Sequence, residues 1–194
     1  MNLEKKTLRR SLLKQRQALS IEEWREKSDR LCMNLQASPQ FISARTILTY
    51  FSFRQEPDLS SLLEMRSSWG IPRCVDRTLV WHRWQPGDPL LPGAYGILEP
   101  DSQLPQLVAK EIDLILVPAV ACDDRGYRLG YGGGYYDRLF ASPEWASIPT
   151  IGIVFEFAYL PELPVEPWDK PLDAVCTEAG FSSSQTDVSP VKLY

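Results

Sequence analysis

A glycine-rich segment, residues 123–138, contains the strongest candidates for ligand-binding residues in this sequence. It follows an apolar run at residues 113–119, which predicts a buried strand, and it leads into a predicted helix at 135–140. Glycines let the backbone approach a ligand closely, and the free N–H groups at a helix start favour phosphate. The order of strand, loop and helix therefore predicts an anion-binding loop. Five of the eleven glycines of the chain lie in it: Gly126, Gly130, Gly132, Gly133 and Gly134.

The common nucleotide motifs do not identify the ligand of this loop. A Walker loop needs Gly-Lys-Ser/Thr, which is absent, and GxGxxG would need a glycine where Tyr135 stands. A glycine-rich turn without any ligand is the alternative. Asp137, at the start of the predicted helix, has two interpretations that the spacing leaves open. It is either a first-turn carboxylate that complements the helix dipole or a ligand for a phosphate-bound Mg²⁺.

Basic side chains are concentrated at the amino-terminal end of an acidic chain. The whole chain carries 21 Lys and Arg against 25 Asp and Glu, a formal charge of −4. Residues 1–18 carry six bases against Glu4 alone, or +5, which leaves 15 bases and 24 acids, or −9, for the remainder. The leucine spacing predicts a helix over residues 4–18, with Lys5, Arg9 and Arg16 on one flank. The acidic remainder argues against general nucleic-acid binding, so the basic helix faces phosphates, a membrane surface or water.

Several protein classes do not fit the sequence. It has no apolar run of the roughly 18–20 residues that a membrane span needs, and no apolar segment of a secretory signal behind the basic amino-terminal residues. The cysteines are far apart, without a CxxC motif or a neighbouring His, which predicts reduced thiols in a cytoplasmic protein. The single histidine, His82, is expected in a strand rather than in catalysis. The cysteines are Cys32, Cys74, Cys122 and Cys176.

Two further helices are predicted downstream of the basic one. Ser20 and Glu23 have the spacing of a capping box, which begins a helix that ends at the Ser-Pro pair of residues 38–39. Asp58 is expected to cap another helix that runs through Trp69 and stops at Gly70.

The predicted strands alternate with these helices, which indicates an α/β fold with a mostly parallel or mixed central sheet covered on both faces. No linker divides the chain, so we expect a single domain over residues 1–194, with a frayed tail at 181–194 and an extended loop at 86–105. The predicted strands cover residues 46–51, 73–75, 78–84, 113–119, 150–155 and 173–177.

The run from Arg128 to Asp137, RLGYGGGYYD, resembles the signature of the 5-formyltetrahydrofolate cyclo-ligases, also called 5,10-methenyltetrahydrofolate synthetases. The resemblance implies a three-layer α/β/α fold of the type shared with ribose-5-phosphate isomerase and CoA-transferase-like domains. Other segments agree with the family in the same order, so the resemblance covers nearly the whole chain. They are KKTLR at 5–9, YFSFRQE at 50–56, YGILEP at 95–100, DLILVP at 113–118 and PLDAVCTE at 171–178.

The resemblance implies a reaction in which 5-formyltetrahydrofolate and ATP give 5,10-methenyltetrahydrofolate, ADP and phosphate, with Mg²⁺. The formyl oxygen is a poor leaving group until the γ-phosphate of ATP is transferred to it, after which N10 of the folate can close the ring. Such an enzyme aligns its substrates, neutralises charge and excludes water. A chain with one histidine and no nucleophile constellation suits that chemistry.

The resemblance also implies binding roles, position by position. Arg9, Tyr135 and Asp137 would act in the reaction, and Asp137 and Asp173 resemble the Mg²⁺-binding carboxylates. Phe51, Glu56 and Tyr95 match folate-contacting positions, and Tyr131, Gly132, Gly133, Gly134 and Tyr135 would border the folate as well. The ATP-binding positions would be Lys5, Lys6, Thr7, Leu8 and Arg9 in the basic helix, with Arg128, Leu129, Gly130, Tyr131, Gly132, Gly133, Gly134, Tyr135 and Tyr136 in the loop.

One position departs from the family pattern. Many members have a lysine in the middle of the loop, where this chain has Gly133. Arg125, Arg128 or a base of the first helix would then supply the missing charge, or the glycine is a tolerated variant. A non-catalytic nucleotide- or folate-binding regulator on the same fold is the alternative function. In either case we expect small-molecule ligands, a monomer, and neither nucleic acid nor membrane as a partner.

Overall fold

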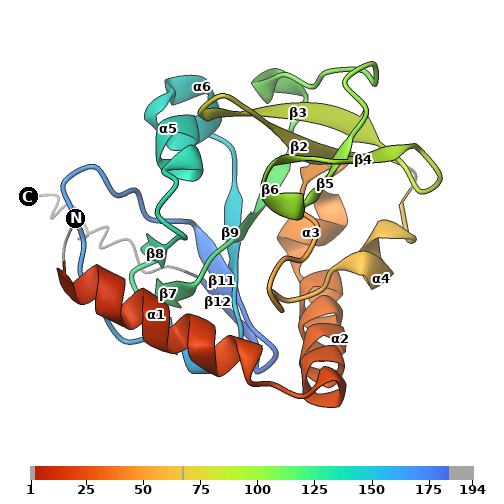
Figure 1. Cartoon of the computed structure of the whole chain (residues 1–194). Helices are drawn as coiled ribbons and strands as arrows, with labels where there is room; N and C mark the ends of the chain where they lie inside the picture. Colours follow the sequence, from red (N-terminus) through yellow and green to blue (C-terminus); the bar gives the residue numbers. More distant parts are fainter. Residues whose placement is uncertain (1–2, 67, 184–194) are drawn as a thin grey trace, which may run out of the picture.

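A seven-stranded sheet forms the centre of the computed structural model, which describes residues 3–66 and 68–183 (Figure 1). The strands lie in the order β12-β11-β9-β6-β1-β2-β3. The inner pairs are parallel, whereas β3 and β12 join the two edges antiparallel. The mixed α/β sheet expected from the sequence is thus confirmed. The strands are β1 (Ile47–Leu48), β2 (Trp69–Val75), β3 (Thr78–Trp84), β6 (Leu114–Pro118), β9 (Thr150–Ile153), β11 (Ala174–Cys176) and β12 (Phe181–Ser183).

Two apolar cores lie on opposite faces of this sheet, because successive strand residues point to opposite sides. In β6, Leu114 and Leu116 belong to one core, and Ile115 and Val117 belong to the other. The first core packs against α2 (Ile21–Ala37), α3 (Pro39–Ser43) and α4 (Ser60–Leu63). The second packs against α1 (Leu3–Gln17), α5 (Tyr135–Ala141) and α6 (Pro143–Ala146), so the fold has three layers (Figure 1).

A small sheet on the α1 side leads from the end of β6 to the glycine-rich loop. Its strands lie in the order β10-β7-β8, with β7 and β8 antiparallel. A separate hairpin, β4 and β5, projects beside β2 and carries a short 3-10 helix in its turn. The remaining elements are β4 (Leu90–Pro92), β5 (Leu98–Pro100), β7 (Ala121–Asp123), β8 (Arg128–Leu129), β10 (Tyr159–Leu160), η1 (Ala94–Gly96), η2 (Ala109–Glu111) and η3 (Glu156–Ala158).

The first two helices agree with the sequence prediction. In α2 the Ser20 hydroxyl accepts a hydrogen bond from the Glu23 N–H at 3.1 Å, and the Glu23 carboxylate accepts one from the Ser20 N–H at 3.1 Å. Helix α1 buries Leu12 against the core. Of its basic residues only Arg16 is buried. In the part of the chain that the structure describes, no helix is long and apolar enough to cross a membrane.

The predicted helix from Asp58 to Trp69 is wrong. Only the four residues of α4 are helical, and Trp69 begins β2. Trp69 is fully buried and its indole N–H donates to the Leu63 carbonyl at 3.0 Å. Gly70 pairs with Leu48 of β1, where a Cβ would lie 2.0 Å from a Leu48 methyl carbon. Strand pairing and the close Leu48 contact thus outweigh the local helical pattern.

Two smaller expectations also need correction. Residues 181–183, predicted as part of a frayed tail, form β12, which pairs with β11; residues 184–194 lie outside the described residues. The expected strand at 46–51 is confined to β1, and the residues between Leu48 and α4 are not in a strand. The expected loop at 86–105 contains β4 and β5.

Candidate active site

The glycine-rich loop joins β8 to α5 with a left-handed backbone at two positions. Gly132 has a φ of 98° and Gly134, the N-cap of α5, has a φ of 69°. An L side chain rarely adopts this region, which accounts for glycine at both. A Cβ on Gly134 would also lie 2.6 Å from an Arg138 nitrogen. The following turn of α5 leaves its first N–H groups without helical partners, as every helix start does.

Two arginines hold the loop from opposite sides. Arg9 of α1 donates from Nε to the Gly130 carbonyl at 2.7 Å, and its guanidinium carbon would lie 3.8 Å from a Cβ on Gly132. Arg138 of α5 donates to the Gly133 carbonyl at 2.9 Å. Partial burial lowers the pKa of Arg9 from its usual value, while Arg9 remains charged at neutral pH. The loop therefore lies in a positively charged environment.

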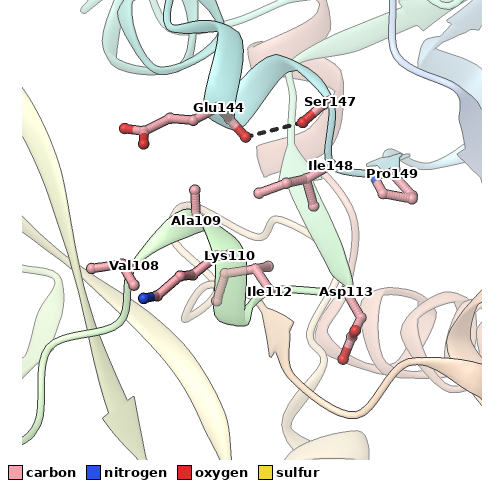
Figure 2. Close-up of a pocket in the computed structure, with 9 residues that line it drawn as sticks. All are labelled: Val108, Ala109, Lys110, Ile112, Asp113, Glu144, Ser147, Ile148 and Pro149. Carbon is pink, nitrogen blue, oxygen red and sulfur yellow. Dashed lines mark hydrogen bonds between the residues drawn. The ribbon is translucent and has the colours of Figure 1, made fainter.

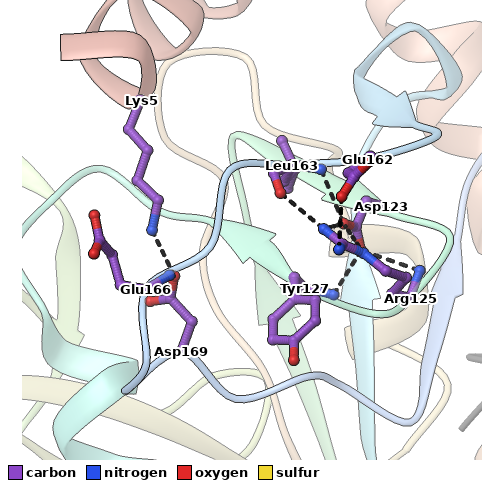
Figure 3. A network of polar contacts seen from close by, with 8 residues as sticks. All are labelled: Lys5, Asp123, Arg125, Tyr127, Glu162, Leu163, Glu166 and Asp169. Carbon is purple, nitrogen blue, oxygen red and sulfur yellow. Dashed lines mark hydrogen bonds and ion pairs between the residues drawn. The ribbon is translucent and has the colours of Figure 1, made fainter. Parts of the chain in front are cut away.

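The other predicted members of the basic helix have different contacts. Lys5 forms an ion pair with Asp169, which fixes the start of α1 to the segment between β10 and β11 (Figure 3). Lys6 and Thr7 are exposed, and Leu8 packs against the core. Of the predicted positions in α1, Arg9 thus contacts the loop directly.

A buried carboxylate fixes the hairpin that delivers the loop. Asp123 is fully buried and accepts hydrogen bonds from the backbone N–H groups of Arg125, Tyr127 and Leu163 (Figure 3). The Arg125 guanidinium also binds Asp123, and it extends to Glu162. The Arg125 side chain is therefore part of this structural network.

The two predicted metal ligands have different neighbours. Arg128 donates to the Asp137 carboxylate, which is 41% exposed, and lies over the Tyr136 ring at 5.4 Å. Asp173 precedes β11, and its carboxylate accepts two hydrogen bonds from Thr150 at 2.8 Å. Among residues 3–66 and 68–183 no cluster of three or more His, Cys, Asp or Glu could hold a metal. Mg²⁺ at a phosphate needs only one or two carboxylates, so a site with Asp137 fits this chemistry.

Glu56 is a buried carboxylate at the end of an unusual turn. Arg54 and Gln55 both have positive φ, 49° and 56°, and the Glu56 carboxylate accepts a hydrogen bond from the Phe53 N–H at 3.1 Å. Burial raises the pKa of Glu56 to about 7, against the opposing effect of the nearby Arg16 charge. The Phe53 ring lies 6.2 Å from the ring of Tyr131. Glu56, the carboxylate predicted to bind folate, and the glycine-rich loop thus lie close to each other.

Of the predicted aromatic residues, Tyr95 contacts Tyr135 at the end of the loop, whereas Phe51 packs against the core on the α2 side of the sheet. Tyr95 is 68% exposed and has a φ of 62°, and its hydroxyl lies 3.3 Å from that of Tyr135. This hydrogen bond and partial burial raise the pKa of Tyr135 to about 12. Phe51 packs edge-on against Trp84 at 5.4 Å.

Two contacts of the loop escaped the sequence analysis. Arg16 binds the Tyr131 hydroxyl and is almost fully buried, and Arg138 binds the loop backbone. A signal existed for each: Arg16 shares the flank of Lys5 and Arg9, and Arg138 directly follows the motif.

A surface depression in the described part of the chain does not coincide with this site. It has a volume of about 770 Å³ and lies between η2 and the residues that follow α6 (Figure 2). Asp113 and Pro149 line it and directly precede β6 and β9, at the amino-terminal ends of these parallel strands. The Asp113 carboxylate there accepts hydrogen bonds from the N–H groups of Arg45 and Thr46. None of the predicted site residues lines this depression.

These features define an α/β protein with an arginine-flanked, glycine-rich loop beside a buried carboxylate. The chain belongs to the 5-formyltetrahydrofolate cyclo-ligase family, which it matches over residues 2–178.

Named relatives cover most of the chain. It is 33% identical to the 5-formyltetrahydrofolate cyclo-ligase of Mycolicibacterium smegmatis over 184 residues, 89% of this chain and 93% of that one. It is 28% identical to that of Escherichia coli K12 over 172 residues, 84% and 93%. The NMR structure of Aquifex aeolicus 5,10-methenyltetrahydrofolate synthetase is 32% identical, with a TM-score of 0.83 over 94% of each chain.

Proposed function

We propose that this protein converts 5-formyltetrahydrofolate and ATP into 5,10-methenyltetrahydrofolate, ADP and phosphate. The observation that carries the proposal is the contact between the turn that bears Glu56 and the glycine-rich loop, through Phe53 and Tyr131. A carboxylate suited to the pterin amino and ring N–H groups lies next to a loop suited to phosphate. Membership of the family supports the same activity.

Two bonds between heavy atoms form and two break in the proposed reaction, and N10 loses a proton. The formyl oxygen attacks the γ-phosphorus, the bond from that phosphorus to the bridging oxygen breaks, and ADP leaves. N10 of the same folate then attacks the formyl carbon and loses its proton, and the carbon–oxygen bond breaks as phosphate leaves. Such steps require alignment and charge neutralisation more than acid–base catalysis by side chains.

Backbone N–H groups of residues 130–134 bind the ATP phosphates in this proposal, and Arg9 supplies the charge that a loop lysine gives other members. Arg9 is favoured because it already contacts the loop, whereas Arg125 is bound to Asp123. Mg²⁺ would neutralise phosphate charge, held by Asp137 and, as the sequence predicts, Asp173. The remaining ATP positions are those predicted: Lys5, Lys6, Thr7, Leu8, Arg128, Leu129, Tyr135 and Tyr136.

The folate is proposed to lie between Glu56 and the loop. Glu56 would accept hydrogen bonds from the pterin, and Phe51 and Tyr95 would contact its rings. Tyr135 would lie between the two substrates. Since all of these residues come from one chain, we propose that it acts as a single-domain monomer. Four free cysteines suit a reducing compartment, and we propose the cytoplasm.

The test is direct. Purified protein with 5-formyltetrahydrofolate and Mg-ATP should produce the near-ultraviolet absorbance of methenyltetrahydrofolate, and none should appear when ATP is omitted. Binding of ATP or folate without product at high protein concentration would instead support the alternative, a non-catalytic regulator.

A further inference from the structure

Arg16 is a buried arginine that connects three separate segments. It is 3% exposed, and it lies seven residues after Arg9 on the same flank of α1. Its Nε donates to the Arg54 carbonyl at 3.1 Å, and one terminal nitrogen donates to the Ala119 carbonyl at 3.4 Å. The other terminal nitrogen donates to the hydroxyl of Tyr131, over whose ring the guanidinium lies at 5.5 Å. A side chain with three fixed donors in different directions suits such a junction.

The partners of Arg16 include both sides of the proposed active site. Arg54 belongs to the positive-φ turn that presents Glu56, and Tyr131 belongs to the glycine-rich loop. Positive φ at two consecutive non-glycine residues is strained, and the carbonyl contact from Arg16 helps to hold that turn in place. A change in Arg16 would therefore release the turn and the loop together.

The charge of Arg16 is not neutralised by its hydrogen bonds, since all three acceptors are neutral oxygens. This charge lowers the pKa of the Glu56 carboxylate, against the larger effect of burial. The other titratable groups that face Glu56 are the phenols of Tyr50, Tyr131 and Tyr136, and burial raises the pKa of each, so they stay neutral near pH 7. Arg16 is thus the positive charge that stabilises the ionised form of Glu56.

We propose that Arg16 is a positioning residue that couples the folate side to the nucleotide side, by orienting the Glu56 turn and Tyr131 together and by keeping Glu56 able to accept hydrogen bonds. This inference rests on the proposed function. Arg16 itself contacts neither substrate in it: Glu56 binds the pterin, and the loop binds the phosphates.

The experiment compares Arg16→Met with Arg16→Lys. The methionine removes the charge, whereas the lysine keeps the charge but has no guanidinium to hold the three acceptors in fixed directions. The matched control is Arg10→Met, an exposed arginine of the same helix. The first readout is the titration of the Glu56 carboxyl carbon by NMR, which needs no turnover. Arg16→Met should raise its midpoint by about one pH unit, and Arg16→Lys should leave it near the original value.

The second readout is the KM for each substrate against pH. In Arg16→Met the KM for 5-formyltetrahydrofolate should rise about tenfold at pH 7 and recover as pH is raised, because Glu56 then ionises. Arg16→Lys should restore this pH profile with a lower kcat. In a Glu56→Gln background, Arg16→Met should change the KM for folate less than about twofold, because Arg16 then has no carboxylate to stabilise.

A purely structural role would give a different result. An unchanged Glu56 titration in Arg16→Met, with a loss of activity that is equal at every pH and additive with Glu56→Gln, would overturn the proposal. Failure of the proposed function is distinguishable, because it would appear as an inactive wild-type protein whose Glu56 titration still depends on Arg16.

Discussion

At the scale of single residues, the site is built on groups whose charge is costly to bury. Glu56 is 4% exposed, and desolvation favours its neutral form. Arg16 and the Phe53 N–H work against that cost. Retaining a carboxylate in this position makes sense where a ligand offers further hydrogen-bond donors, as a pterin does.

The burial of Glu56 predicts a pH-dependent stability. Its pKa in the folded protein, about 7, lies above the ordinary value of 4.5, so the folded state keeps this proton longer than the unfolded state. The free energy of unfolding therefore falls as pH rises from about 4.5 to about 7. Glu56→Gln removes this decline and should be the more stable protein at pH 8, by up to about 3 kcal/mol, with little difference at pH 4.

Urea unfolding at several pH values measures this difference. Glu22→Gln, at an exposed position of α2, is the control and should follow the wild type. Parallel stability curves for the wild type and Glu56→Gln would show that Glu56 does not titrate as its burial indicates.

Arg9 and Arg10 offer a second comparison at this scale. Both are arginines of α1, but Arg9 binds the loop and Arg10 is exposed. Arg9→Ala should raise the KM for ATP roughly 10- to 100-fold, the value of a charged hydrogen bond to phosphate. Arg10→Ala should change it less than about twofold. Equal effects would mean that the helix acts through its overall charge alone.

At the scale of elements, the β7–β8 hairpin and the loop after it decide where the phosphate-binding groups lie. Asp123 fixes the hairpin turn and the segment around Leu163, and Arg9 and Arg138 hold the loop from α1 and α5. The conformation of the loop then depends on glycine at two positive-φ positions. Local strain is tolerated because contacts from several elements enforce the same geometry.

Alanine substitutions at Gly132 and Gly87 distinguish the effect of backbone strain from an effect on ATP binding. Their φ values, 98° and 99°, are nearly equal, and Gly87 lies in the open turn after β3, far along the chain from the motif. Alanine at either position should cost about 1–2 kcal/mol of stability. Only Gly132→Ala should also weaken ATP binding, measured by titration calorimetry. Similar loss of ATP binding in both variants would contradict the role of the loop.

Elements also show where the sequence was informative. The strands at 113–119 and 150–155 are buried apolar runs, and the capping box begins α2, so local patterns predicted them. The region from Asp58 to Gly70 could not be predicted in this way, because its conformation depends on pairing with Leu48 and on the burial of Trp69. The helix was predicted there from Asp58 as an N-cap and Gly70 as a C-terminal stop.

At the scale of the whole molecule, the site exists because the fold brings distant segments together. The partners of Arg16 lie 38, 103 and 115 residues away in the chain. The motif residues and Glu56 could be proposed from the sequence, since family resemblance marks them. The sequence also placed Arg16 on the flank of Lys5 and Arg9, but its burial and its contact with Tyr131 could not be predicted, because a buried arginine and an exposed one have the same spacing on a basic helix.

Asparagine substitutions at Asp137 and Asp173 test whether both carboxylates bind Mg²⁺. Asp137 lies in α5 and Asp173 directly precedes β11, and their partners are Arg128 and Thr150. Asn at either position should raise the Mg²⁺ concentration for half-maximal turnover, about tenfold for Asp137, which has the more exposed carboxylate. A Mg²⁺ titration at constant ATP measures this. If Asp173→Asn lowers the melting temperature alone, its carboxylate anchors Thr150 and its predicted metal role is wrong.

The fate of the formyl oxygen shows whether ATP phosphorylates this oxygen before the ring closes. The protein is given Mg-ATP and 5-formyltetrahydrofolate that carries ¹⁸O in the formyl group, and the released phosphate is analysed by mass spectrometry. If ATP phosphorylates the formyl oxygen, each phosphate carries one ¹⁸O atom and forms together with methenyltetrahydrofolate, and no label appears when the ¹⁸O is supplied in water instead. Unlabelled phosphate, or product formed without ATP cleavage, would contradict the proposed phosphorylation.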